Sequence, residues 1–198
     1  GQPCRCATCV RPCVATLTLE LSSPCAGCSV SISVTGPDGS KSAEVSKVIS
    51  AARETVSLQV PAVKPWSPDM PHLYRARIDI RADGQVIDST THSFGFRSFE
   101  AREGKFFLNG EPFYMRGALD QDYYPEGIWT PPSVEVLEDQ IHKAKALGLN
   151  FLRCHIKVPD PRYYEAADRL GMLIWTEIPN VATFTENSAR RMRETMQG

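Results

Sequence analysis

Three short apolar runs alternate with two helical patterns between residues 106 and 180, and this alternation constrains the fold more than any other feature. The apolar runs lie at residues 113–118, 149–155 and 172–178. They are rich in Phe, Leu, Ile and Trp and do not alternate strictly with polar residues, which is typical of strands covered on both faces. The order strand, helix, strand, helix, strand with short connections predicts a parallel sheet of right-handed βαβ units.

Both helical patterns carry start and stop signals. Ser133 is suited to cap the first helix, and Gly148 is suited to end it. The apolar side chains of this helix share one face: Val134, Leu137, Ile141 and Ala144. In the second helix Asp160 is the candidate N-cap, Pro161 suits the first helical position, and Gly171 stops the helix. These signals place both helices between the predicted strands.

The preceding residues carry the pattern of short antiparallel strands. Apolar and polar residues alternate in four runs, at residues 14–21, 30–34, 55–60 and 73–80. Asp83-Gly84 has the composition of a two-residue hairpin turn. Six or seven short strands with frequent turns predict an immunoglobulin-like β-sandwich. The sequence therefore predicts three parts: a Cys-rich tail at residues 1–13, an immunoglobulin-like β-sandwich at 14–100, and an incomplete (β/α) TIM-barrel segment at 105–198.

Composition and charge exclude several classes of partner. The chain has 198 residues, of which 42% are hydrophobic and 23% charged, with a formal net charge of −1. This charge gives no reason to expect nucleic acid or an anionic membrane surface as a partner. No apolar run approaches the roughly 18 residues that a membrane-spanning helix needs. The N-terminus lacks both a signal peptide and an initiator Met, so we expect a processed product or an excised piece.

Seven cysteines are unevenly placed along the chain. Four crowd the first thirteen residues: Cys4, Cys6, Cys9 and Cys13. Two C-x-x-C pairs are present, Cys6 with Cys9 and Cys25 with Cys28. Their separation falls in the range of four-thiolate zinc sites, but no His accompanies them, and disulfides or free thiols are the simpler interpretation. We therefore predict no metal, and we predict that Cys154 is a small buried thiol.

Candidate site residues follow from the rule that barrels of this kind carry their working groups at the C-terminal ends of strands. Applied to the three predicted strands, the rule points to residues 120–124, then to Arg153, His155 and Lys157, and then to Trp175, Glu177 and Asn180. From these we select five candidates: Asp122, Arg153, His155, Trp175 and Glu177. Carboxylates and planar cations bind hydroxyl groups, and aromatic rings stack on pyranose faces. We therefore predict that these five residues bind a carbohydrate substrate.

Each of these residues also has a structural alternative. Arg153 and Glu177 can pair with other charged groups to hold the sheet together. His155 can be a core histidine with satisfied hydrogen bonds, and Asp122 can cap a turn. Trp175 can belong to the hydrophobic core, which is the commoner fate of a tryptophan.

Several short motifs follow one another in a distinctive order. They are Leu108-Asn109-Gly110-Glu111-Pro112, Arg116-Gly117, Gly148-Leu149-Asn150-Phe151-Leu152-Arg153, Tyr163-Tyr164, Ala167-Asp168, Leu170-Gly171-Met172-Leu173-Ile174-Trp175 and Glu177-Ile178-Pro179-Asn180. In this order and spacing the sequence resembles the start of the catalytic barrel of glycoside hydrolase family 2, which includes β-galactosidases, β-glucuronidases and β-mannosidases. Residues 66–74 and 94–97 resemble the segments that close the family's immunoglobulin-like domain.

The resemblance implies hydrolysis of a terminal β-linked sugar with retention of configuration and without an organic cofactor. Arg153 matches the family's arginine at the end of the second strand, whereas His155 comes one position earlier than the family's histidine. Gln121 and Asp122 stand where many members have His-Glu. These departures bear on which sugar is preferred.

The resemblance also places the catalytic carboxylates on the fourth and a later barrel strand, and a full barrel takes about 250 residues. We therefore expect this chain to be a fragment of a retaining glycosidase that is inactive alone. The alternative is a non-catalytic carbohydrate-binding or protein-interaction module. The open edge of an incomplete sheet further predicts self-association into a homo-oligomer.

Overall fold

The computed structural model describes residues 13–25 and 27–197. The chain divides into two compact units, Gly1–Phe113 and Tyr114–Gly198. The first unit thus continues past the boundary that the sequence predicts near residues 98–105, because three further strands precede Tyr114. The domain ranges given above remain a prediction. Most of the predicted Cys-rich tail lies outside the described residues.

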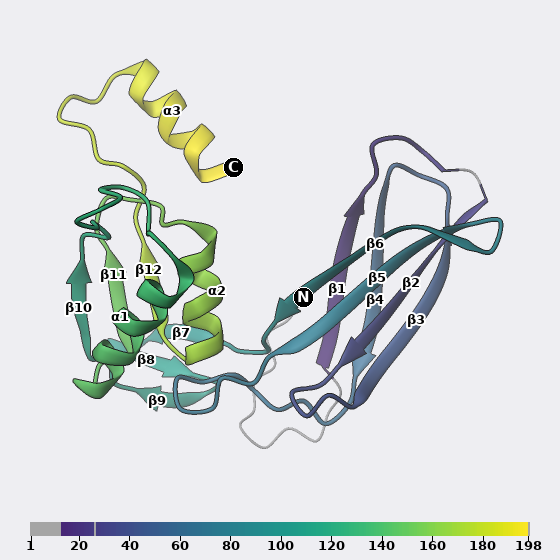
Figure 1. Ribbon diagram of the computed structural model, residues 1–198, viewed down its shortest axis with the longest axis horizontal. Coiled ribbons are helices and arrows are strands. Elements are labelled where there is room, and N and C mark those ends of the chain that lie inside the picture. The colour runs from purple at the N-terminus through teal and green to yellow at the C-terminus, as the bar shows by residue number, and fades with distance from the viewer. Residues whose placement is uncertain (1–12, 26, 198) are drawn as a thin grey trace. The chain divides into compact units, whose positions relative to one another are not determined.

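The first six strands of the first unit form a β-sandwich of two antiparallel sheets (Figure 1). One sheet pairs β1 (Cys13–Glu20) with β4 (Arg53–Val60), and the other has the order β3 (Lys41–Ile49), β2 (Cys28–Thr35), β5 (Tyr74–Ala82) and β6 (Gln85–Phe94). Every second residue is buried along β2 and along the last five residues of β4. The apolar residues so selected, among them Ile32 and Val60, pack together in one core.

A three-stranded sheet follows, in the order β7 (Phe99–Arg102), β8 (Lys105–Leu108) and β9 (Glu111–Phe113). The turn between β8 and β9 is Asn109-Gly110, whose φ angles of 53° and 86° are those of a tight hairpin turn. Asn109 also joins this sheet to the sandwich. Its Oδ1 accepts a hydrogen bond from Ser98 N at 3.0 Å, and its Nδ2 donates to Trp66 O at 3.0 Å.

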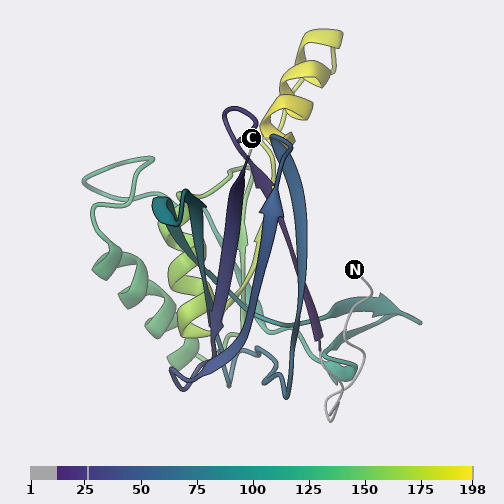
Figure 2. The same ribbon diagram turned by 90° about the vertical axis from the view of Figure 1, so that its right-hand side faces the viewer.

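The second unit contains a parallel sheet in the order β10 (Gly117–Asp120), β11 (Phe151–Cys154) and β12 (Leu173–Thr176). The strands are linked by α1 (Val134–Ala146) and α2 (Pro161–Leu170), so the predicted strand-helix alternation is confirmed. Both helices lie to one side of the three strands (Figures 1 and 2). There, buried residues of helices and strands form a second core, including Leu137, Ile141, Leu152, Cys154, Tyr163 and Met172.

The start and stop signals of α2 act as the sequence predicts. The carboxylate of Asp160 accepts a hydrogen bond from Arg162 N at 2.9 Å, and Pro161 occupies the first helical position. Gly171 ends the helix with a left-handed φ of 78°. At α1, Ser133 occupies the N-cap position, but its side chain caps no backbone N–H of the helix.

Asp160→Ala is expected to lower the free energy of unfolding by about 1 kcal/mol, because α2 loses its N-cap. The Arg162 side chain, and next the Arg162 N–H, lower the pKa of Asp160 from 3.8 to about 2. The charged carboxylate therefore stabilises the fold above about pH 4, and this contribution is lost as the pH falls toward 2. Urea unfolding at pH 7 and pH 2.5 measures this contribution as the difference in stability between wild type and Asp160→Asn. A stability difference that does not shrink at the lower pH would contradict the assignment.

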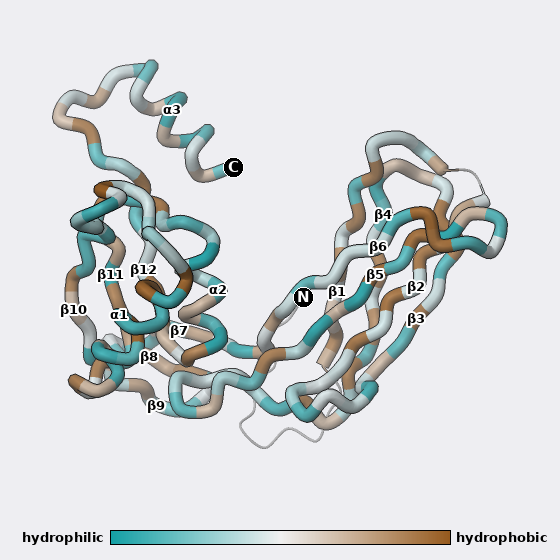
Figure 3. The backbone as a smooth tube through the Cα atoms, in the orientation of Figure 1, coloured by the Kyte–Doolittle hydropathy of each residue, from teal (hydrophilic) through white to brown (hydrophobic). Residues whose placement is uncertain are grey.

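The last helix, α3 (Glu186–Gln197), has no buried residue and is mostly hydrophilic (Figure 3). Arg190 Nη1 lies 2.6 Å from Glu194 Oε1 on its exposed surface. Such an exposed pair one helical turn apart contributes only a few tenths of a kcal/mol to stability. No helix among the described residues is long and apolar enough to cross a membrane.

Candidate functional site

The three parallel strands of the second unit end at one edge of their sheet. Asp120, Cys154 and Thr176 are the last residues of β10, β11 and β12, and they are neighbours in the strand register. The segments that follow these strands therefore start side by side. This confirms the expectation that Asp122, Arg153 and Glu177 lie at the same end of the sheet, here called the rim.

An ion pair joins the ends of the second and third strands. Arg153 Nε and Nη2 lie 2.6 Å and 2.5 Å from Glu177 Oε1. Glu177 Oε2 accepts a hydrogen bond from Ile156 N at 3.0 Å. The Ile156 N–H, and next Arg153, lower the pKa of the Glu177 carboxyl below its ordinary value. Glu177 is therefore a fixed carboxylate and not a proton donor at neutral pH.

Backbone strain accompanies this contact. Ile156 has a φ of 48°, which a β-branched residue rarely adopts. Such a conformation costs of order 1 kcal/mol or more and persists where the surroundings impose it. Here it turns the Ile156 N–H toward Glu177, so the strained residue helps to fix the carboxylate.

The face of the sheet opposite the helices carries a second group of rim residues. Leu152, Cys154 and Ile174 contribute to the core under the helices. Because side chains alternate along a strand, Arg153 and Trp175 point to the other face. Trp175 is 52% exposed, so the described residues do not place it in a core. The Arg153 guanidinium carbon lies 5.6 Å from the centre of the Trp175 ring, which puts a cation, a carboxylate and an aromatic surface together.

The side chain of His155 makes one weak polar contact at the rim. Its backbone N donates to Asp120 O at 3.0 Å, which extends the pairing of β10 and β11 by one residue. Its ring Nδ1 lies 3.4 Å from Gln121 Oε1, a long and weak contact. The imidazole is only half-buried at the rim, so it is not a core histidine.

Asp122, in contrast, is only 3% exposed. Its Oδ1 accepts a hydrogen bond from the Tyr124 hydroxyl, and its Oδ2 lies 2.7 Å from Lys157 Nζ. The second contact is an ion pair without hydrogen-bond geometry. Lys157 Nζ also donates hydrogen bonds to Asp122 O and Trp129 O, each at 2.7 Å. Asp122 thus holds the segment after β10 in place. This role is closer to the structural alternative, the capping of a turn, than to direct sugar binding.

Comparisons with known proteins fit this architecture. Residues 12–97 match the family profile for glycosyl hydrolases family 2. A putative β-glucuronidase of Formosa agariphila is 30% identical over 168 residues, which are 83% of this chain and 16% of that protein. The apo structure of Bacteroides uniformis β-glucuronidase 3 has a TM-score of 0.77 and 26% identity, over 94% of this chain and 24% of that one. The chain belongs to glycosyl hydrolase family 2.

The family 2 relatives are much longer than this chain. A β-galactosidase of Thermoanaerobacter pseudethanolicus is 34% identical over 116 residues, which are 58% of this chain and again 16% of the relative. The chain therefore spans about a sixth of the length of these curated relatives. The resemblance stated from the sequence motifs is confirmed at the level of the family.

From the sequence we selected the buried Asp122 but not two other enclosed residues of this family 2 chain, Lys157 and Tyr163. Lys157 pairs with Asp122, and the Tyr163 hydroxyl donates to Asp120 Oδ2 at 2.8 Å. Beside them Cys154 is fully buried and free, as predicted, and burial raises the pKa of its thiol to about 12. The sequence signal that could have identified Lys157 as a site residue was its position at a strand end, two residues after His155.

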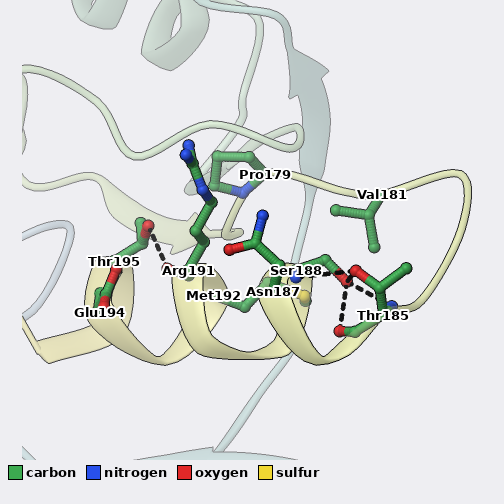
Figure 4. A pocket seen from close by; sticks show the side chains of 9 residues that line it. All are labelled: Pro179, Val181, Thr185, Asn187, Ser188, Arg191, Met192, Glu194 and Thr195. Atoms are coloured by element: carbon green, nitrogen blue, oxygen red, sulfur yellow. Dashed lines mark hydrogen bonds between the residues drawn. The ribbon is translucent and has the colours of Figure 1, made fainter.

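Hollows also occur beside α3 in the second unit. A cavity of about 480 Å³ is lined by Pro179, Val181, Thr185 and residues of α3 (Figure 4). None of the five predicted site residues lines it. No residue of α3 is buried, so α3 does not pack closely around this hollow.

The zinc alternative also has no support in the described part of the chain. Cys25 and Cys28 are joined in a disulfide, so their thiolates are not available as ligands. Cys6 and Cys9 lie outside the described residues. No cluster of three or more metal-ligating side chains occurs in residues 13–25 and 27–197.

Proposed function

We propose that the second unit is the first part of a (β/α) TIM barrel and that the sandwich before it is immunoglobulin-like. Three observations support the barrel. The strands are parallel, helices cover one face, and the other face carries residues suited to a barrel interior, such as Phe151 and Leu173. The active sites of such barrels lie at the C-terminal ends of the strands, which is where the ion pair lies.

The same rim is the proposed site for a terminal β-linked sugar. The observation that carries this proposal is the Arg153–Glu177 pair beside the exposed Trp175 ring. A fixed carboxylate accepts hydrogen bonds from sugar hydroxyls, a guanidinium donates to them, and an indole stacks on the apolar face of a pyranose. His155 adds a further polar group, and Asp122 contributes by holding the neighbouring segment.

The chemistry of hydrolysis needs more than this rim provides. A retaining glycosidase uses two carboxyl groups about 5 Å apart, one as nucleophile and one as acid/base. Among the described rim residues, Glu177 is held by Arg153, Asp122 pairs with Lys157, and Asp120 accepts from Tyr163. We therefore propose that the chain binds part of the substrate of a retaining glycosidase without hydrolysing it alone.

Arg153→Ala and Trp175→Ala are each expected to weaken sugar binding about tenfold, because each removes one contact worth roughly 1.4 kcal/mol. NMR titration of the chain with methyl β-D-galactoside and methyl β-D-glucuronide measures this. The control is Arg102→Ala, which removes an Arg that lies 3.9 Å from the Phe107 ring centre in the first unit. Equal affinities for wild type and both rim variants would refute the proposed site.

The same protein preparations test the absence of turnover. We expect no hydrolysis of aryl β-galactosides, β-glucuronides or β-mannosides by the chain alone. Turnover that disappears in Glu177→Gln would instead place a catalytic carboxylate on this rim.

A further inference from the structure

Two exposed aromatic rings lie together on the segment that follows β10. The centres of the Tyr123 and Trp129 rings are 4.9 Å apart, with an interplanar angle of 62°. Tyr123 is 51% exposed and Trp129 is 61% exposed. Neither residue contributes to the core of the second unit. Large aromatic side chains that share an exposed surface are typical of binding sites.

The backbone that carries these rings is held in place. Tyr124 and Ile128 form two backbone hydrogen bonds with each other, of 3.1 Å and 2.8 Å. Lys157 Nζ donates to the carbonyl oxygens of Asp122 and Trp129, and so ties both ends of this turn to the segment after β11. The rings are therefore presented by a fixed turn, which lowers the entropy lost when a ligand binds.

Adjacent residues join this turn to the proposed sugar site. Ile156 N holds Glu177, and the next residue, Lys157, holds the turn. Both groups of residues thus belong to the same rim. Lys157 itself is not available to bind a substrate carboxylate, because two carbonyl oxygens and Asp122 surround its ammonium group.

We propose that the Tyr123–Trp129 pair is a second sugar-binding subsite, on which the pyranose next to the terminal sugar stacks. The substrate class is then a β-linked oligosaccharide and not a simple glycoside with a small leaving group. This inference rests on the proposed function of the Arg153–Glu177–Trp175 group, which binds the terminal ring. Neutral aromatic faces select a ring by shape, so this subsite adds affinity without requiring a charge on the second sugar.

The test compares mono- and disaccharides on the 198-residue chain. NMR titrations with methyl β-D-galactoside, methyl β-D-glucoside, lactose and cellobiose give the ratio of disaccharide to monosaccharide affinity. We expect Trp129→Ala and Tyr123→Ala each to reduce this ratio about tenfold. The hydrogen bond from Lys157 that holds the turn is kept in Trp129→Ala, because its acceptor is the main-chain oxygen of residue 129. Trp129→Phe keeps a ring and is expected to retain most of the ratio.

The outcomes separate this inference from the function on which it rests. Trp175→Ala should weaken both sugar classes equally and leave the ratio unchanged. If no sugar binds to wild type, the proposed function and this inference both fail. If sugars bind but the ratio is the same in wild type and Trp129→Ala, only the subsite is refuted. Trp129 could also increase the affinity for 4-nitrophenyl β-D-galactoside but not for lactose. That result would refute the second sugar subsite and show that the aromatic pair binds a planar leaving group.

Discussion

Replacing Lys157 with methionine is expected to lower the free energy of unfolding of the second unit by about 3–5 kcal/mol. The side chains of Lys157 and Asp122 are only 13% and 1% exposed. Methionine has a similar length but no charge, so the variant leaves the Asp122 carboxylate buried without its cation. The carbonyl oxygens of Asp122 and Trp129 also lose their donor. Removing one partner of a buried pair is costly mainly because of the group left behind.

Two further variants isolate the buried pair. Asp122→Asn removes the negative charge and suits the left-handed φ of 52° at this position, so Asp122→Asn/Lys157→Met should be more stable than Lys157→Met alone. Lys143→Met is the matched control, because Lys143 forms an exposed pair with Asp139 and should change stability by less than about 0.5 kcal/mol. Urea unfolding of the four proteins measures this. A Lys157→Met variant as stable as Lys143→Met would show that the pair does not stabilise the unit.

The elements of the second unit could be predicted because their signals are local. Asp160, Pro161 and Gly171 lie within a few residues of the ends that they define, and these ends are where the structure has them. The strand β3 (Lys41–Ile49) was not predicted, because only Ile49 among its residues is fully buried. β3 forms because it pairs with β2 in the sheet. This pairing depends on the neighbouring strand, so the sequence pattern of β3 itself does not predict it.

In the candidate site, too, some features follow from local sequence signals and others depend on residues far apart in the chain. The strand-end rule was sufficient to place Arg153 and Glu177 at one edge, because it depends only on the order of parallel strands. The burial of Asp122 could not be predicted. It depends on a left-handed backbone at Asp122 itself and on a lysine 35 residues away that turns back onto it. Contacts between loops of this kind leave no periodic pattern in the sequence.

Gly117→Ala is expected to lower the free energy of unfolding by about 3 kcal/mol, at the upper end of the cost of overpacking. Gly117 and Phe151 are direct neighbours in the register of β10 and β11. A Cβ atom at Gly117 would lie 1.8 Å from Cδ1 and 2.1 Å from Cε1 of the Phe151 ring. The ring would have to leave its position, in which its centre lies 6.3 Å from that of Trp175. The substitution should therefore also disturb the proposed sugar site.

The decisive comparison is the same substitution in a Phe151→Ala background. The φ of Gly117 is not in the left-handed region, so alanine fits its backbone once the ring is gone. Replacing glycine by alanine then restricts the unfolded chain and is expected to stabilise the protein by about 0.4–1 kcal/mol. Gly117→Ala should thus destabilise wild type and stabilise Phe151→Ala, a change of sign that urea unfolding of the four proteins detects. An equal loss in both backgrounds would mean that the Phe151 ring is not what requires glycine at this position.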